Sequence, residues 1–390
     1  MKFFYCKKCL MPSTRPRSEF NEDGVGVCHG CLHSEKKITF DWDARWKDLQ
    51  SLCDKYRGEG KHPDMIIPWS GGKDSYHIAY MMKYELGMNP LLVKVAPLIP
   101  TEIGKRNEDN IRDAGFRLIK IYPEQVYVDL CLKGLIEQGR PQMGFVTGIT
   151  TMLIQEAMRH NIKLIMYGEE GETEYGGRTD YSSHGFNRQW IVDVYFSGHD
   201  TNEYDLDLWH LPSQEELDKA GVCFAHWSNF ANWDGELHLH HAKKIGFEYD
   251  PPAEDGVTGI GTFTNYTSLD DPYLRTFHTY LMFLKFGFGR GSHEATGEIR
   301  AGRMDRFNGI LCANNYDDYD CADFWDRLCH LYRVTPVELE KIVDSHANLA
   351  IVEKVGYWKR LDRRWQLRPI LQDYNRFIED GIEIDYDGIY

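Results

Sequence analysis

The sequence has no uninterrupted run of about 20 apolar residues, the length that a transmembrane helix requires. Its opening segment, MKFFYCKKCL, carries lysines where a signal peptide would have its apolar region. Together these absences predict a cytoplasmic protein that does not insert into a membrane. The chain also lacks internal repeats and low-complexity tracts, so the order of its predicted elements is the guide to its fold.

An excess of positive charge is missing too, because 45 lysines and arginines stand against 60 aspartates and glutamates, a net charge of −15. A nucleic-acid partner normally requires a basic stripe, so we expect none, although a local basic pocket is compatible with this balance. With 42% apolar and 13% aromatic residues, a chain of 390 residues can bury a substantial core. Its length favours about two or three structural units.

Two cysteine pairs lie near the N-terminus, Cys6-Lys-Lys-Cys9 and Cys28-His-Gly-Cys31, with 18 residues between them. Each pair can make a tight turn that aims two sulfurs at one ion, and this spacing is typical of a tetrahedral zinc site. In a cytoplasmic chain, metal ligands are expected before disulfides. A segment this short cannot fold on apolar burial alone, which predicts a structural Zn²⁺ bound by these four cysteines.

Strand-length apolar runs alternate with helical patterns in the middle of the chain. Such alternation predicts an α/β fold, a parallel twisted sheet with helices on both faces and ligands at the carboxyl ends of its strands. The expected strands are 65–69, 91–96, 117–122 and 163–168, and the expected helices are 75–86, 102–114 and 147–160. The predicted units are a zinc-ribbon-like unit (1–40), a helical connector (41–62), the sheet domain (63–250) and a mostly helical C-terminal region for substrate or partner (251–390).

The stretch Ser70-Gly-Gly-Lys-Asp-Ser75 lies where the first of these strands ends and a helix begins. Free backbone N–H groups and the positive end of the helix dipole converge there and favour an anion. The glycines allow close approach of phosphate oxygens, and Lys73 adds positive charge. Asp74 would repel a bare phosphate but suits Mg²⁺ or a neighbouring amide. The stretch does not fit the Walker A pattern, which disfavours a kinase or an ordinary P-loop ATPase.

A strand followed by SGGKDS resembles the PP-loop of the ATP pyrophosphatases, which have the adenine nucleotide alpha hydrolase-like fold and split ATP between its α and β phosphates. The resemblance implies that the loop holds the departing pyrophosphate while a substrate oxygen attacks the α phosphorus. It also implies that the next strand end lies near adenine and that the later strand end at Gly168 flanks the nucleotide. The nucleotide-binding candidates are therefore Ser70, Gly71, Gly72, Lys73, Asp74, Ser75, Val93, Val95 and Gly168.

Six further stretches extend the resemblance over nearly the whole chain: CKKCLMPSTRP, GMNPLLVKV, YGEEGETEYGG, TNYTSLDD, YLMFLKFGFGR and EIRAGRM. Together with the loop they are similar to the N-acetyl sugar amidotransferase family. This resemblance implies that ATP, Mg²⁺ and ammonia convert an acetamido group on a bacterial surface sugar, nucleotide-linked or free, into an acetamidino group. Such sugars are intermediates for O-antigen or for flagellar nonulosonic acids. Ammonia would come from a separate glutaminase subunit, often accompanied by a cyclase-like subunit.

Charged residues near two glycine-rich stretches are further catalytic candidates. Glu169, Glu170 and Glu174 follow a strand end and suit metal binding, sugar recognition or proton transfer, although a solvated acidic loop would look the same. Lys285 and Arg290 are the favoured cations of a stretch that also holds Arg300 and Arg303, and they suit phosphates or an acidic sugar. A solvated helix face is the alternative for these cations.

Two more segments carry weaker signals. Residues 178–212 follow the predicted nucleotide loop, and from this position we expect them to distinguish one sugar from another. Residues 224–244 hold Trp227 and Trp233, which suit ring stacking but more often pack in a core. The histidines 238, 240 and 241 lack a metal-binding motif and are interpreted as surface or core side chains.

Two other functions compete with the amidotransferase. A tRNA sulfur transferase also combines zinc-binding cysteines with a PP-loop, but it generally needs a catalytic cysteine pair in the loop domain, where Cys131 stands alone and the next cysteine is Cys223. The acidic charge balance also argues against tRNA. A noncatalytic nucleotide-binding scaffold is the third reading, and the intact loop argues against it.

Overall fold

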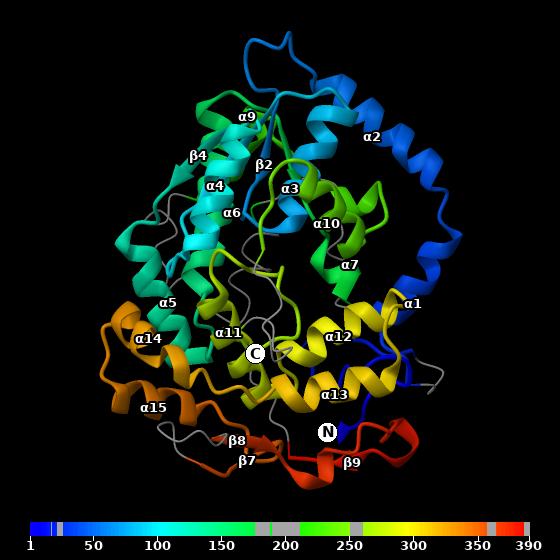
Figure 1. Cartoon of the computed structure of the whole chain (residues 1–390), viewed down its shortest axis with the longest axis vertical. Helices are drawn as coiled ribbons and strands as arrows, with labels where there is room; N and C mark the ends of the chain where they lie inside the picture. Colours follow the sequence, from blue (N-terminus) through cyan, green and yellow to red (C-terminus); the bar gives the residue numbers. More distant parts are fainter. Residues whose placement is uncertain are drawn as a thin grey trace.

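A five-stranded parallel sheet lies in the upper part of the computed structural model as Figure 1 shows it, above the C-terminal helices. The structure describes residues 1–16, 18–21, 26–175, 188, 211–249, 260–356 and 364–385. The strands follow one another across the sheet in the order β4-β3-β2-β5-β6. Their bounds are β2 Met65–Pro68, β3 Pro90–Val95, β4 Arg117–Ile121, β5 Leu164–Tyr167 and β6 Cys223–His226.

Both faces of the sheet are covered by helices because its central strands are apolar on both sides. Ile67 of β2 packs into one core cluster and its neighbour Ile66 into another, as the alternation of side chains along a strand requires. The first cluster is closed by α2 Trp42–Tyr56, α3 Lys73–Tyr80, α4 Glu102–Asp113 and α10 Gly235–Lys244, and the second by α6 Met143–Arg159 and α9 Gln214–Ala220. The predicted fold class is confirmed for this sheet and its helices.

The strand order reverses between β2 and β5. From β2 the chain moves through α3 and α4 to β3 and β4, and then returns across α5 (Gln125–Gln138) and α6 to place β5 on the other side of β2. Ligands of open parallel sheets bind outside the strand ends at such a reversal. The loop after β2 and the segment after β5 therefore border the same crevice.

Several elements differ from the prediction. Strand β6 and helix α5 were not predicted, and α3 begins at Lys73 rather than at residue 75 because the loop is shorter than expected. A π-helical turn, Met81–Glu85, continues α3 to nearly the predicted end at residue 86. Helix α6 begins at Met143, four residues before the predicted start at 147, because its first turn includes the small residue Gly144 packed against the carbonyl of Tyr127.

The C-terminal region is mostly helical in its described part, as predicted. Its core is built from buried aromatic and aliphatic side chains such as Phe277, Trp325 and Tyr332. The bounds are α11 Pro272–Phe286, α12 Arg290–Arg300, α13 Arg306–Tyr316, α14 Trp325–Tyr332 and α15 Pro336–Ser345, followed by the antiparallel pair β7 Val352–Lys354 and β8 Trp365–Leu367. Short 3₁₀ turns cover Ala322–Phe324, Pro369–Leu371 and Ile378–Asp380.

The N-terminal cysteine-rich segment packs on this helical region rather than on the sheet. Strand β1 (Lys2–Phe3) pairs antiparallel with β9 (Ile382–Glu383), so the two ends of the described chain lie together at one end of the molecule (Figure 1). Helix α1 (His29–Lys36), a 3₁₀ turn (Lys37–Thr39) and α2 then lead along the edge of the molecule to the sheet. The division into four units at 40, 62 and 250 stays a prediction.

Helices of membrane-spanning character are absent from the described ranges, where none combines the required length with sufficient apolarity.

Candidate functional site

The Ser70–Ser75 loop connects β2 directly to the N-terminus of α3. The N-cap residue of α3 is Gly72, which has no side chain that could accept a hydrogen bond from the first amides of the helix. Within the loop, the Gly72 amide donates to Ser70 Oγ (3.3 Å) and Ser75 Oγ donates to the Gly72 carbonyl (2.9 Å). The chain thus forms a tight turn whose backbone is suited to receive an anion.

Gly71 is required by the shape of this turn. Its φ of +87° is a left-handed conformation that L side chains rarely adopt, and a Cβ built there would lie 3.2 Å from Lys94 Nζ. Lys94 comes from β3, is 1% exposed, and forms ion pairs with Glu108 (3.1 Å) and Asp270 (3.6 Å). A second lysine therefore lies directly beside the loop.

An L residue in the left-handed conformation costs about 1–2 kcal/mol. Replacing Gly71 with alanine should lower the free energy of unfolding by more than this amount. The added Cβ would press on the Lys94 ammonium, which is held by the Glu108 and Asp270 carboxylates. Urea denaturation measures the loss. Gly60→Ala is the matched control, because Gly60 has a φ of +79° and nothing lies within 4 Å of its built Cβ. Equal losses in the two variants would contradict the close approach of Lys94.

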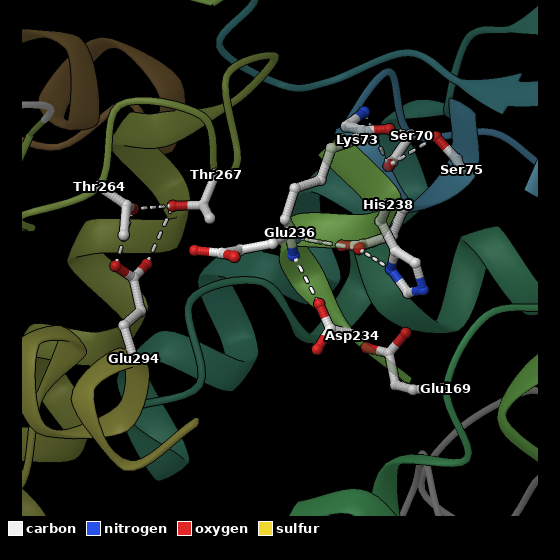
Figure 2. A network of polar contacts seen from close by, with 12 residues as sticks. Ser70, Lys73, Ser75, Glu169, Asp234, Glu236, His238, Thr264, Thr267 and Glu294 are labelled. Carbon is white, nitrogen blue, oxygen red and sulfur yellow. Dashed lines mark hydrogen bonds and ion pairs between the residues drawn. The ribbon is translucent and has the colours of Figure 1, made fainter. Parts of the chain in front are cut away.

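Lys73 and Asp74 form a charged pair at the start of α3. The Lys73 ammonium contacts both carboxylate oxygens of Asp74 at 2.9 Å, and His238 Nδ1 lies 2.7 Å from one of them (Figure 2). Burial raises the pKa of Asp74, but the Lys73 charge and the His238 hydrogen bond outweigh it and hold the pKa well below its usual range. Asp74 is therefore an anion whose side chain remains 37% exposed.

His238 was interpreted from sequence as an ordinary structural histidine. It is fully buried, and besides its bond to Asp74 its ring stacks on His77 (4.1 Å) and meets Trp233 edge-on (4.4 Å). His77 Nδ1 in turn lies 2.9 Å from His241 Nδ1. These contacts arise because α10 packs against α3, and no local sequence motif predicts them.

Glu169 follows β5 and faces the same crevice, with its carboxylate pointing toward His238 and Asp234 in Figure 2. Burial raises its pKa, and the nearby Asp74 carboxylate raises it further. Tyr175 donates a hydrogen bond to Glu169 Oε1 (3.1 Å). Carboxylate oxygens are the ligands that a divalent cation prefers, so Asp74 and Glu169 are the candidate ligands for Mg²⁺ at this loop.

The other two predicted glutamates have structural contacts. Glu170 is 5% exposed and its carboxylate accepts from the Thr173 amide (2.8 Å), which stabilises the start of α7 (Gly171–Tyr175). Glu174 Oε2 accepts from Lys37 Nζ at 2.7 Å, and this ion pair ties α7 to the N-terminal segment. The structure thus brings Glu169 to the loop and gives Glu170 and Glu174 other partners, while their catalytic roles stay predictions.

A cavity of about 210 Å³ begins at the loop and follows the sheet edge. Ser70, Val93 and Val95 line it, and the Arg275 side chain faces it from α11. The assignment of these residues to the nucleotide stays a prediction. Among the described residues we find no hydrogen bond or ion pair made by the Arg275 guanidinium. A cation without a partner among the described residues, beside this loop, suits a nucleotide phosphate.

The segment TNYTSLDD, residues 264–271 of the C-terminal region, lies over this crevice. Lys73 Nζ lies 5.8 Å from the centre of the Tyr266 ring, and Asp270 pairs with Lys94. Thr264 (2.9 Å) and Thr267 (3.0 Å) donate to Glu294 of α12, which fixes the segment in place (Figure 2). Sequence reasoning missed Lys94, Asp270 and Arg275. Lys94 could have been predicted, because it is a lysine inside an apolar strand and a buried charge requires a partner.

Lys285 and Arg290 lie among the C-terminal helices. Lys285 Nζ donates to the Gln138 carbonyl (2.7 Å), and Arg290 pairs with Glu294 (3.0 Å) and donates to the Ile260 carbonyl (3.0 Å). In the described ranges neither side chain contacts the loop, so their assignment to substrate stays a prediction. The predicted specificity segment 178–212 lies outside the described residues except for positions 188, 211 and 212.

The four predicted zinc ligands converge on one point. The Sγ atoms of Cys6, Cys9, Cys28 and Cys31 all lie within 4.8 Å of one another, and all four residues are buried. Cys9 and Cys28 are 3.6 Å apart and Cys6 and Cys31 are 3.9 Å apart. Four sulfurs at tetrahedral Zn–S distances are about 3.8 Å apart, whereas a disulfide requires about 2.05 Å. The cluster therefore fits a structural zinc ion, and its geometry is compatible with a zinc ribbon.

Comparison with curated proteins found no match to the chain. Residues 260–365, which contain the segment over the loop and helices α11 to α15, match the family model described as LPS biosynthesis protein WbpG-like, C-terminal domain. The match shows that this part of the chain is similar to the C-terminal domain of that family of lipopolysaccharide biosynthesis proteins.

Proposed function

We propose that the chain is an ATP-dependent amidotransferase of the ATP pyrophosphatase type, which converts the acetamido group of an N-acetylated bacterial sugar into an acetamidino group. The observation that carries the proposal is the Ser70–Ser75 loop, placed at the strand-order reversal with uncapped helix amides, Lys73 and the Asp74–Glu169 carboxylates around it. The WbpG-like match supports a sugar of the bacterial surface as the substrate class. A cytoplasmic location is part of the proposal.

Activation is the first chemical step. An amide oxygen is a poor leaving group and its carbonyl a poor electrophile, so ammonia cannot displace it unaided. The amide oxygen attacks the α phosphorus of ATP, the bond between this phosphorus and the bridging oxygen breaks, and pyrophosphate leaves. The α3 amides and Lys73 stabilise the departing charge, and Mg²⁺ held by Asp74 and Glu169 would neutralise part of it.

Ammonia completes the reaction. It adds to the carbon of the O-adenylyl imidate, the carbon–oxygen bond to AMP breaks, and one proton is lost, which leaves an amidine that is cationic near neutral pH. Water must be excluded, because hydrolysis of the imidate would return the acetamide. We propose that ammonia comes from a separate glutaminase subunit, accompanied by a cyclase-like subunit.

The environment of Cys131 supports amidation over sulfur transfer. Its thiol is fully buried and accepts a hydrogen bond from the Phe145 amide (3.2 Å). Burial raises the pKa of Cys131 to about 12, which suppresses the thiolate that sulfur transfer requires.

Incubation with ATP, Mg²⁺, ammonium chloride and a panel of free and nucleotide-linked N-acetyl sugars tests the proposal. We expect AMP, pyrophosphate and a sugar product lighter by the difference between O and NH, detected by mass spectrometry. Glutamine should not replace ammonium when the chain is alone. Absence of AMP with every sugar would contradict adenylation, and glutamine-driven turnover would contradict the separate source of ammonia.

A further inference from the structure

A second cavity, of about 390 Å³, lies between α1, α7, the start of α10 and α12. Its volume is within the range of small-molecule sites, roughly 300–1,000 Å³. Trp42 and Trp233 line it together with polar groups such as Asn232. Asn232 is exposed, and in the described part of the chain its amide has no hydrogen-bond partner. Aromatic faces with polar groups around them are the usual surroundings of a sugar ring.

Helix α12 contributes two residues with buried, unpaired polar atoms to the wall of this cavity. Thr296 is 2% exposed and its Oγ1 has no hydrogen-bond partner among the described residues, and the same holds for Arg300 Nε. The two residues are four positions apart and so share one helix face. Buried polar atoms are nearly always paired, so two unpaired atoms on residues of one cavity wall favour a polar ligand, which they would reach after a small side-chain movement. Gly297 lies beside them, and a Cβ built on it meets nothing within 4 Å.

The cavity borders the proposed site of adenylation. Tyr175 lines it and donates to Glu169. Trp233 also lines it, and a Cβ built on Gly168 would lie 3.0 Å from this ring. A Cβ on Gly235, next to the lining residue Asp234, would lie 3.7 Å from Lys73 Nζ. A molecule in the cavity is therefore separated from the loop by single side chains.

We propose that this cavity binds the N-acetylated sugar ring whose acetamido group is adenylated, an inference that rests on the proposed function. The tryptophans stack on the ring, and Thr296, Arg300 and Asn232 bind its hydroxyl groups and amide. The nucleotide occupies the separate cavity beside Val93 and Val95.

Charge pairing within the cavity favours an uncharged ring. Lys37 is paired with Glu174 (2.7 Å), and Asp234 is paired with Arg303 (2.8 Å). The Arg300 terminal nitrogens contact Cys28 Sγ (3.4 Å) and the Glu174 carbonyl (3.2 Å). Because these charges already have partners, the cavity can bind a ligand mainly through hydrogen bonds. The hydroxyl and amide groups of an N-acetylated sugar can form such bonds.

Thr296→Val is the sharpest test, because it removes the unpaired hydroxyl and keeps the side-chain shape. Saturation-transfer NMR with N-acetylglucosamine, N-acetylgalactosamine, N-acetylmannosamine and the UDP-linked forms of the first two reports on the acetyl methyl group. We expect a signal with the unmodified protein, about tenfold weaker binding in Thr296→Val, and an unchanged or higher unfolding temperature. Comparing free and UDP-linked sugars shows which form the cavity takes.

Thr279→Val is the matched control. Thr279 is also a buried helical threonine, but its hydroxyl donates to the Arg275 (3.2 Å) and Thr276 (3.0 Å) carbonyls and lies outside the cavity lining. This control should lose stability and keep sugar binding. If Thr296→Val binds every sugar as well as the unmodified protein, or if no sugar of the panel gives a signal, the inference is wrong.

Gly297 supplies an independent variant. Gly297→Ala should fold normally and keep sugar binding, whereas Gly297→Leu should fill the cavity mouth and abolish the acetyl signal. Retained binding in Gly297→Leu would overturn the inference.

These binding measurements use no ATP, so they separate the cavity from the reaction. If the unmodified protein binds the sugar but makes no AMP, and Thr296→Val loses this binding, only the proposed function is refuted. AMP formation with an unchanged KM for the sugar in Thr296→Val would refute the cavity assignment alone.

Discussion

Lys73→Ala is expected to reduce ATP-dependent AMP formation by about 10³-fold or more, because a preorganised charge beside the leaving group acts mainly in the transition state. The Lys73 ammonium lies at the uncapped start of α3, 2.9 Å from Asp74. The fold should persist, since Asp74 keeps its hydrogen bond to His238. A coupled assay of pyrophosphate release measures the loss.

Lys83→Ala is the control for this variant. Lys83 lies on the π-helical turn that continues α3, and its ammonium donates to the Gly115 carbonyl (2.7 Å), away from the loop. This variant should retain activity. Full turnover by Lys73→Ala would show that the loop does not hold the departing phosphates.

Removal of the metal is expected to have the largest effect on stability. The purified protein should contain one zinc ion per chain, and Cys28→Ser should lose it together with several kcal/mol of stability, because binding to such a site is coupled to folding. The cluster around the metal site consists of the four cysteines and a few apolar side chains such as Val27 and Phe288, so the packing of this part of the segment depends on the ion. Elemental analysis and thermal denaturation measure both effects.

Cys312→Ser is the matched control, since Cys312 is a partly exposed thiol outside the cluster. It should keep the zinc ion and the unfolding temperature. A protein without zinc, or a Cys28→Ser variant as stable as the unmodified chain, would contradict the metal assignment. Because Lys37 and Arg300 connect this segment to α7, loss of the metal should also reduce activity.

Local patterns were sufficient for the features that depend on local chemistry. The spacing of the cysteine pairs predicted a cluster that the structure brings within 4.8 Å, and the apolar runs predicted β2 to β5 because buried parallel strands need apolar side chains on both faces. The glycines between a strand and a helix predicted the tight turn at Ser70–Ser75, and its binding of an anion stays a prediction. In each case the signal comes from a short local pattern in the sequence.

Tertiary contacts explain what the sequence did not reveal. Strand β6, Cys223–His226, is defined by pairing with β5 rather than by its own pattern. His238 reaches Asp74 because α10 packs against α3. Glu174 belongs to an acidic stretch that resembled a catalytic cluster, yet its partner Lys37 is 137 residues away. Such pairings are set by the fold and leave no periodic or spacing signal.

The most direct test of the central claim follows the amide oxygen. A sugar that is turned over in the presence of ammonium is prepared with ¹⁸O in its acetamido carbonyl, and the AMP formed is analysed by mass spectrometry. Attack of this oxygen on the α phosphorus places the label in AMP, and we predict one ¹⁸O atom in each AMP released. Unlabelled AMP, or ADP in place of AMP, would contradict adenylation of the sugar amide at this loop.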